Sequence, residues 1–277
     1  MPRRRWTNPG AVSCVLAVGV LALAVVWRTV GRDGGSRTAS GVTSRPATQS
    51  ASSATAFAPS GSPTTRVLFT FDGLRSMAYA DSAGQLSMHV QTAHGGTLAL
   101  IPHGGGLALR FPAPCAHYGA PECARAVLTS DPAPWLNPGT RDLRYGAMVL
   151  LGAGATTKGE NILQKGISNI AISQFKLQVD GIEGRPSCVI VGVGSHDIHV
   201  ALASRSVADG QWHRLDCVRK GDILAVLIDG AAAGTVSIPA NLMVRNDLPL
   251  QVGGKGAGPG NDQFNGDLDD VYVEIFG

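Results

Sequence analysis

This chain of 277 residues has few aromatic residues, few charged residues and very few glutamates. Aromatic side chains make up 5% of the sequence, so no cluster of sugar-stacking rings is evident. Glycoside hydrolases need two carboxylates at a defined separation. The chain has only four glutamates, Glu122, Glu160, Glu183 and Glu274, and the aspartate pair Asp267 and Asp269 fits a structural terminal strand better. The Gly-x-Ser-x-Gly motif of serine hydrolases is absent too. These absences argue against a hydrolytic enzyme.

Zinc and phosphate motifs are also absent. There is no Cys-x-x-Cys pair and no suitably spaced pair of histidines for zinc. The glycine-rich segment 253–263 lacks the Gly-Lys-Ser/Thr order of a phosphate loop, so we interpret it as a surface loop. Residues 1–66 hold 8 Lys and Arg against 1 acidic residue, whereas residues 67–277 hold 15 against 19. The larger part of the chain is therefore mildly acidic, which argues against a nucleic-acid partner.

The uncharged segment 11–27 follows Arg3, Arg4 and Arg5. A positive start and an apolar stretch are typical of a signal peptide or a signal anchor. As a helix the segment would rise roughly 25 Å, slightly less than a bilayer core of about 30 Å. The apolar stretch continues past a candidate cleavage site at 22–24, which favours an uncleaved anchor within residues 1–30. We expect a single membrane span with the C-terminal part outside the cell, or secretion if the segment is cleaved.

Residues 31–66 are dominated by Gly, Ser, Thr, Ala and Pro. Such a segment buries too little apolar surface to offset the entropy lost on ordering. It therefore predicts a disordered linker between the N-terminal segment and a folded domain at 67–277.

The exported part of the chain contains four cysteines, and an even number in an oxidising compartment predicts two disulfides. Three pairings are open. We favour Cys115–Cys123 and Cys188–Cys217, because Cys188 and Cys217 both lie in predicted strands that could be neighbours.

Short apolar stretches recur through residues 67–277 between Gly, Pro, Asn and Asp, and none has the period of a long amphipathic helix. Alternating or continuous apolar residues predict strands in these segments: 67–71, 107–111, 145–151, 175–179, 188–193, 198–202, 248–252 and 264–276. The fold class this predicts is all-β, a two-sheet antiparallel jelly-roll sandwich with its first and last strands adjacent.

Residues 209–230 predict a hairpin that turns at Lys220-Gly221-Asp222. In its first strand Leu215 and Cys217 point to one face, and Arg214 and Asp216 point to the other. In the last strand, the apolar positions change from even to odd numbers across Asp269-Asp270. A one-residue slip of this kind predicts a β-bulge.

Several segments together resemble laminin G-like domains, relatives of the concanavalin A-like lectin sandwiches. They are FTFDG at 69–73, GGGLALRF at 104–111, LNPGTRDLRYGAMV at 136–149, NILQKG at 161–166, the 209–230 hairpin and FNGDLDDVYVEI at 264–275. The pairing of PSC at 186–188 with LDC at 215–217 resembles a disulfide of bacterial members. The Glu-x-Asp-x-Glu motif of laminarinase-like relatives is missing. The resemblance implies a binding module outside the cell.

Many sandwiches of this superfamily hold a structural Ca²⁺ near their two termini. The resemblance places it at Asp269 and Asp270, with Asp72 or its neighbouring backbone carbonyls supplied by the first strand, and carboxylates and carbonyls are suitable ligands for this ion. The alternative is that these residues are solvated carboxylates at the rim.

Trp135 and Tyr118 lie in proline-rich loops and are our candidates for ligand contact, within the candidate loops 112–140 and 253–263. We interpret Trp212 as a packing residue. The sequence therefore predicts a membrane-tethered module that binds a glycan or a cell-surface protein. A glycosidase of the same fold and a structural cell-envelope protein are the alternatives.

Overall fold

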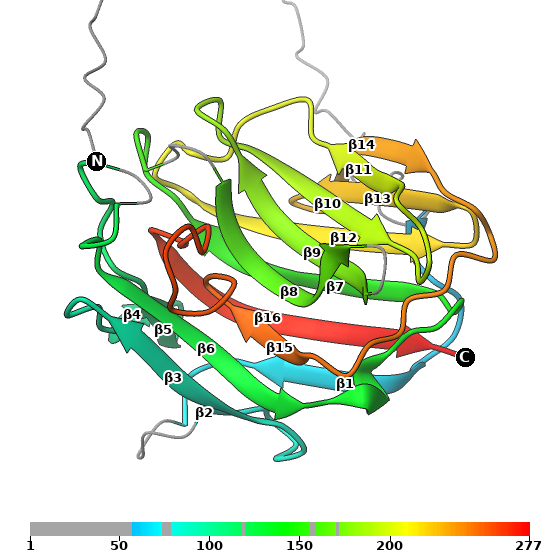
Figure 1. Cartoon of the computed structure of the whole chain (residues 1–277), viewed down its shortest axis with the longest axis horizontal. Coiled ribbons are helices and arrows are strands. Elements are labelled where there is room, and N and C mark those ends of the chain that lie inside the picture. Colours follow the sequence, from blue (N-terminus) through cyan, green and yellow to red (C-terminus); the bar gives the residue numbers. More distant parts are fainter. Residues whose placement is uncertain (1–56, 74–78, 118–119, 156–158, 170–171) are drawn as a thin grey trace, which may run out of the picture. The chain divides into compact units, whose positions relative to one another are not determined.

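The alternating apolar residues of the domain build two antiparallel sheets that face each other across one core (Figure 1). The computed structural model describes residues 57–73, 79–117, 120–155, 159–169 and 172–277. Within these residues each sheet has eight strands. The predicted two-sheet antiparallel sandwich is confirmed.

The first sheet, sheet A, has the strand order β14 (Ala231–Ser237), β13 (Ile223–Ile228), β12 (Trp212–Lys220), β7 (Leu143–Leu150), β16 (Asp267–Phe276), β5 (Gly106–Arg110) and β4 (Ala99–His103), with β1 (Pro63–Phe69) also paired to β16. The second, sheet B, has the order β11 (Ile198–Leu202), β10 (Arg185–Val191), β9 (Ile172–Asp180), β8 (Gly159–Asn169), β15 (Pro249–Val252), β6 (Arg125–Pro132), β3 (Ser87–Ala93) and β2 (Tyr79–Ala80). A short 3-10 helix, η1 (Pro134–Leu136), follows β6.

The first and last strands pair, as expected, with Phe69 opposite Val271 and Pro63 opposite Phe276 (Figure 1). Strand β1 begins at Pro63, four residues before position 67, where the sequence predicts that the folded domain begins. The final strand begins at Asp267, and the prediction that it starts at 264 was wrong. Phe264 is buried, but its N–H donates to Gly253 O across a loop rather than along a sheet.

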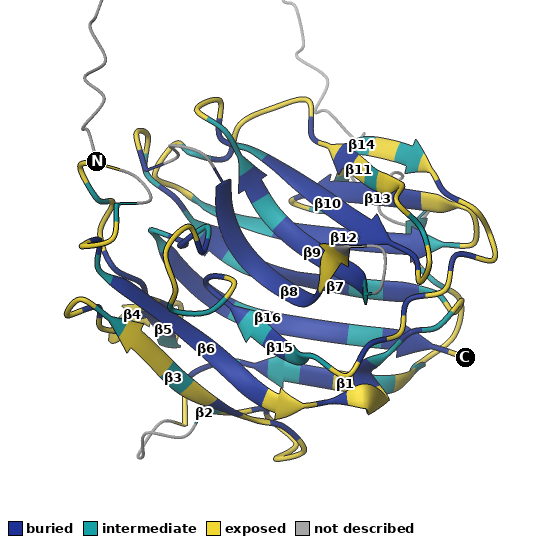
Figure 2. Ribbon diagram, in the orientation of Figure 1, coloured by how far each residue is buried: buried dark blue, intermediate teal, exposed yellow. Residues whose placement is uncertain are grey.

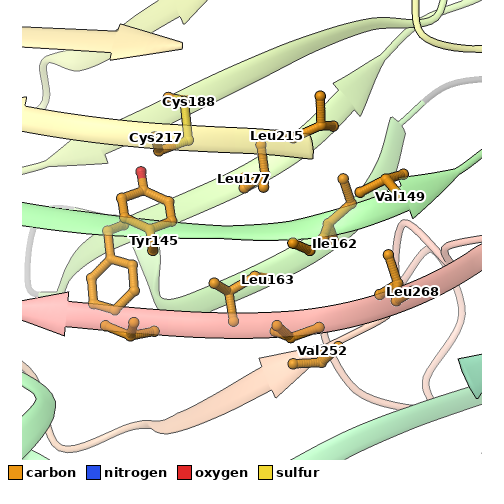
Figure 3. Close-up of a cluster of buried hydrophobic side chains, with 14 of the residues drawn as sticks. Tyr145, Val149, Ile162, Leu163, Leu177, Cys188, Leu215, Cys217, Val252 and Leu268 are labelled. Atoms are coloured by element: carbon orange, nitrogen blue, oxygen red, sulfur yellow. A yellow bond between two sulfur atoms is a disulfide. The ribbon is translucent and has the colours of Figure 1, made fainter. Parts of the chain in front are cut away.

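The main core is an apolar cluster formed by the inward faces of both sheets. The disulfide Cys188–Cys217 joins β10 of sheet B to β12 of sheet A within it, with 5.6 Å between Cα atoms. Figure 3 shows this disulfide among buried side chains that include Tyr145 and Leu177. The second disulfide, Cys115–Cys123, closes a surface loop. Both pairings agree with the expected ones, and two disulfides indicate an oxidising, extracellular environment for the domain.

The hairpin and the bulge also occur where the sequence places them. Strands β12 and β13 pair around Gly221, which has a φ of 58°, a value that glycine adopts readily. In β16 the register shifts between Asp269 and Tyr272, and Asp270 takes a φ of 46°. This bulge lets Leu268 and Val271 both reach the core.

Exposed residues gather on loops and on strands near the sheet margins, such as β14, β11 and β3 (Figure 2). No helix in the described ranges is long and apolar enough to cross a membrane. The predicted signal anchor lies outside the described residues.

Candidate functional site

The clearest candidate site is a groove beside Trp135, with a volume of about 340 Å³. Trp135 sits in η1 and is 40% exposed, whereas the next residue, Leu136, is fully buried in the core. Leu136 therefore anchors the short helix and fixes the position of the indole. The groove is lined by β1, by the turn between β2 and β3, and by Trp135: Thr64, Thr65, Arg66, Leu68, Asp81, Ser82, Ala83, Gln85 and Trp135.

Hydrogen bonds hold the polar wall of this groove in place. Asp81 is buried, and its two carboxylate oxygens accept from the N–H groups of Leu86 (2.6 Å) and Ala83 (3.1 Å). The Ser82 hydroxyl donates to Leu68 O (2.9 Å), which ties the turn to β1. The exposed side chain of Gln85 also lines the groove. The groove thus combines one aromatic face with polar groups on a fixed backbone.

Arg66 adds a cation to the groove, and this cation is already paired. Its Nε lies 3.2 Å from Glu274 Oε1. The Arg66 side chain is more than half exposed, so solvent screens its ion pair with Glu274. The guanidinium can therefore still donate hydrogen bonds to a ligand.

Two of the three aspartates predicted to bind calcium, Asp72 and Asp269, contact the hairpin of β4 and β5. Asp72 Oδ1 accepts from the N–H of Leu107 (2.7 Å), and Asp269 Oδ2 lies 2.6 Å from His103 Nδ1. The other oxygen of Asp269 accepts from the N–H of Asp270 (2.7 Å). Within the described ranges, no group of three or more His, Cys, Asp or Glu side chains is placed to hold a metal. A calcium ion at Asp269 would compete with His103 for Oδ2, and calcium stays a prediction.

His103 also contacts Trp212, the other tryptophan that the sequence singled out. The two rings are stacked, with 3.9 Å between centroids and 25° between planes. Trp212 is only partly exposed, because one face of its indole is covered by His103. Its environment favours the packing interpretation over a sugar platform.

The other candidate segments offer less room. Tyr118 lies outside the described residues. The loop 253–263 is tied down by Arg125, which donates to Ala257 O (2.9 Å), and by Gln263, which bonds to both backbone groups of Ala126. The hollow between this loop and the Cys115–Cys123 disulfide measures about 20 Å³, enough for about one water molecule.

Sequence reasoning missed a buried polar network on the outward face of sheet A. Asp216 is fully buried, accepts from Arg144 Nη2 (3.1 Å) and Arg214 Nε (3.2 Å), and also accepts the hydroxyl hydrogen of Tyr272. Burial and the Asp216 charge keep the pKa of Tyr272 well above its ordinary value. The sequence signal was the alternation itself, which sends Arg214 and Asp216 to one face without showing what covers them.

These features define a lectin-type β-sandwich with an aromatic groove near the start of β1. The chain belongs to the concanavalin A-like lectin/glucanases superfamily, because residues 135–274, half of the sequence, match that family model. No curated protein matches the sequence.

Solved structures of binding domains share the fold. The binding domain of Paraclostridial mosquitocidal protein 1 is 13% identical, with a TM-score of 0.52 over 76% of this chain and 49% of that one. The binding domain of botulinum neurotoxin DC in complex with SialylT is 10% identical, with a TM-score of 0.54 over 77% of this chain and 48% of that one. Our chain thus spans about half of these toxin domains.

Domain 4 of AbnA, an extracellular arabinanase from Geobacillus stearothermophilus, was solved in complex with arabinotriose. It is 14% identical to this chain, with a TM-score of 0.55 over 76% of this chain and 91% of that one. At these identities the similarity is one of fold.

Proposed function

We propose that the domain is an extracellular glycan-binding module and that the groove beside Trp135 is its site. The observation that carries this proposal is the exposed indole at a groove with a polar, hydrogen-bonded wall. Sugar rings have apolar C–H faces that pack on aromatic rings, and hydroxyls that need fixed donors and acceptors. Trp135 supplies the first kind of contact, whereas Gln85, Arg66 and Thr65 supply the second.

The fold relatives support this function. An arabinanase domain of the same fold was solved with arabinotriose, and a toxin domain was solved with SialylT. The two disulfides suit a domain exposed outside the cell. We extend the proposal to a membrane tether through residues 1–30, with secretion after cleavage as the alternative.

The test is glycan-array binding by the full chain, followed by calorimetric titration of the glycans that bind. Trp135→Ala should weaken binding at least tenfold, because an interface tryptophan is commonly a hot spot. Ile198→Ala on β11 is the matched control, since Ile198 is 55% exposed and does not line the groove. Equal melting temperatures for both variants would confirm intact folding. Unchanged affinity in Trp135→Ala would overturn the assignment of the site.

A cell-surface protein is the second candidate partner, and one surface favours it. Strand β11 lies at the margin of sheet B, and Ile198, Val200 and Leu202 alternate along one of its faces, each at least 39% exposed. This exposed apolar face can dock on an apolar surface of a partner. Val200→Asp should abolish capture of such a protein while glycan binding by the Trp135 groove stays unchanged.

We also propose that the domain does not hydrolyse its ligand. Asp81 is the one carboxylate among the residues that line the Trp135 groove. This lining supports a binding role, because a glycosidase needs two carboxyl groups that reach the substrate. Turnover of chromogenic glycosides by the purified chain would contradict this proposal.

A further inference from the structure

A second hollow opens beside the segment 245–248 and has a volume of about 370 Å³. It is lined by Ile172, Val193, Arg245, Asn246, Asp247 and Leu248. Arg245 and Asp247 are exposed, whereas Asn246 between them is buried. The hollow thus presents a cation, a carboxylate and apolar side chains, a combination that suits hydroxyl groups and the C–H faces of sugars.

Hydrogen bonds connect the segment that contains Arg245 to the segment that follows Trp135. Asn137, two residues beyond Trp135, donates from Nδ2 to Asn246 O (2.9 Å), and its Oδ1 accepts from the N–H of Asn246 (3.2 Å). Gly139 and Val244 form a bridge next to this pair, with both N···O distances at 3.0 Å. These hydrogen bonds therefore hold the segment that contains Trp135 against the segment that contains Arg245. Trp135 lines the first groove, and Arg245 lines the second hollow.

Buried groups hold segment 245–248 rigid. The ammonium of Lys165 donates to Asn246 O (2.9 Å), Asn246 Oδ1 (3.1 Å) and Leu248 O (3.0 Å). Ser173 adds three further bonds. Its hydroxyl donates to Arg245 O (2.9 Å) and accepts from the N–H of Arg245 (2.7 Å), and its backbone O accepts from Asn246 Nδ2 (3.0 Å). These bonds turn Asn246 inward and leave Arg245 and Asp247 outside. A preorganised wall costs little ordering entropy when a ligand binds.

We propose that the ligand is the interior of a linear polysaccharide, which runs from the Trp135 groove into the hollow at Arg245 and Asp247. This inference rests on the proposed function. Each hollow alone is near the lower limit of ligand sites, which measure about 300–1,000 Å³. Two such hollows on fastened segments suit a chain of several sugar residues better than one terminal sugar.

The experiment compares di- and hexasaccharides of arabinan, xylan and β-glucan by calorimetric titration with the full chain. For the polysaccharide whose oligosaccharides bind, the hexasaccharide should bind at least tenfold more tightly than the disaccharide. Arg245→Ala with Asp247→Ala should abolish this gain and leave disaccharide affinity unchanged. Trp135→Ala should weaken both ligands. The matched control is Arg205→Ala, which removes an exposed arginine that lines neither hollow.

The outcomes separate the two proposals. Equal affinity for both lengths in the unmodified chain, or a length gain that survives the double substitution, overturns the second hollow and leaves the Trp135 site intact. Binding that is insensitive to Trp135→Ala, or no binding to any set, overturns the proposed function and this inference with it.

Discussion

The Nδ1 atom of His213 lies 2.9 Å from Oδ2 of Asp229, in the turn that joins β13 to β14. Its Nε2 lies 3.2 Å from both carboxylate oxygens of Asp209, in the loop before β12. The imidazole can donate from both nitrogens at once only when it is protonated. His213 thus joins a loop and a turn that are separate in sequence.

Replacing His213 with Gln should lower the free energy of unfolding by about 0.5–1 kcal/mol, since both carboxylates are exposed to solvent. Burial raises the pKa of Asp229. Hydrogen bonds from His213, the Arg214 N–H and Arg205 lower this pKa by more than burial raises it, so the net pKa is below its ordinary value. A lowered carboxyl pKa stabilises the fold above its unfolded value of about 3.9. That stability is lost as the pH falls through the folded pKa.

The difference between the two proteins should therefore shrink as the pH falls from about 5 to about 3. Urea unfolding at these two pH values measures it. A difference that grows over this interval would refute the ion-pair explanation.

The two disulfides should contribute unequally to stability. Their cysteines are 8 and 29 residues apart in the sequence. In the chain-entropy model these loops correspond to about 2.5 and 3.6 kcal/mol. Cys188→Ala with Cys217→Ala should destabilise the fold more than Cys115→Ala with Cys123→Ala, and the loss of buried core atoms increases the difference. Urea unfolding of both double variants checks the order, and a reversed order would contradict the loop-length argument.

Glu160 should make the domain less stable as the pH rises. Burial raises its pKa from 4.5 to about 8; the hydrogen bond from the Asn265 N–H to Oε2 (2.7 Å) opposes this shift. Between these two values the folded state holds a proton that the unfolded chain has lost. The free energy of unfolding should therefore fall with pH, by up to roughly 1.4 kcal/mol per unit.

Glu160→Gln removes the titration while keeping an oxygen acceptor. Its stability relative to the unmodified chain should rise between pH 5 and about 8, as measured by urea unfolding at several pH values. Parallel stability curves for the two proteins would show that Glu160 does not titrate in this range.

Much of the fold follows from local alternation. Residues 198–202, the hairpin at Gly221 and the bulge at Asp270 occur where the pattern places them. Strands β2, β3, β4, β6, β8 and β14 were not predicted. In β14, Ala, Gly and Thr leave no apolar face to detect. Alternation also does not say which face is inward. Val189 lies outside the main core cluster, whereas its neighbours Cys188 and Ile190 lie within it.

The site was less predictable than the fold. A proline-rich loop identified Trp135, but its groove partners come from β1 and the β2–β3 turn, which lie more than 45 residues earlier. Only the packing of the two sheets brings these segments together. Asp216 shows the same limit, since its burial depends on Arg144 and Tyr272 from other strands.

Calcium binding at Asp72, Asp269 and Asp270 predicts a competition with His103, because His103 occupies one oxygen of Asp269. Calcium at a hundredfold excess over its Kd should stabilise the fold by about 2.7 kcal/mol. For a domain of about 200 residues this raises the Tm by roughly 5–10 °C.

Chelation should reverse the shift, and Asp269→Asn should abolish it. His103→Ala should strengthen calcium binding, because it removes the competing donor. Thermal unfolding with calcium and with chelator, together with elemental analysis, measures these effects. An unchanged Tm and no bound metal would leave Asp269 as a hydrogen-bond partner of His103, and its carboxylate would then serve to hold the β4–β5 hairpin against β16.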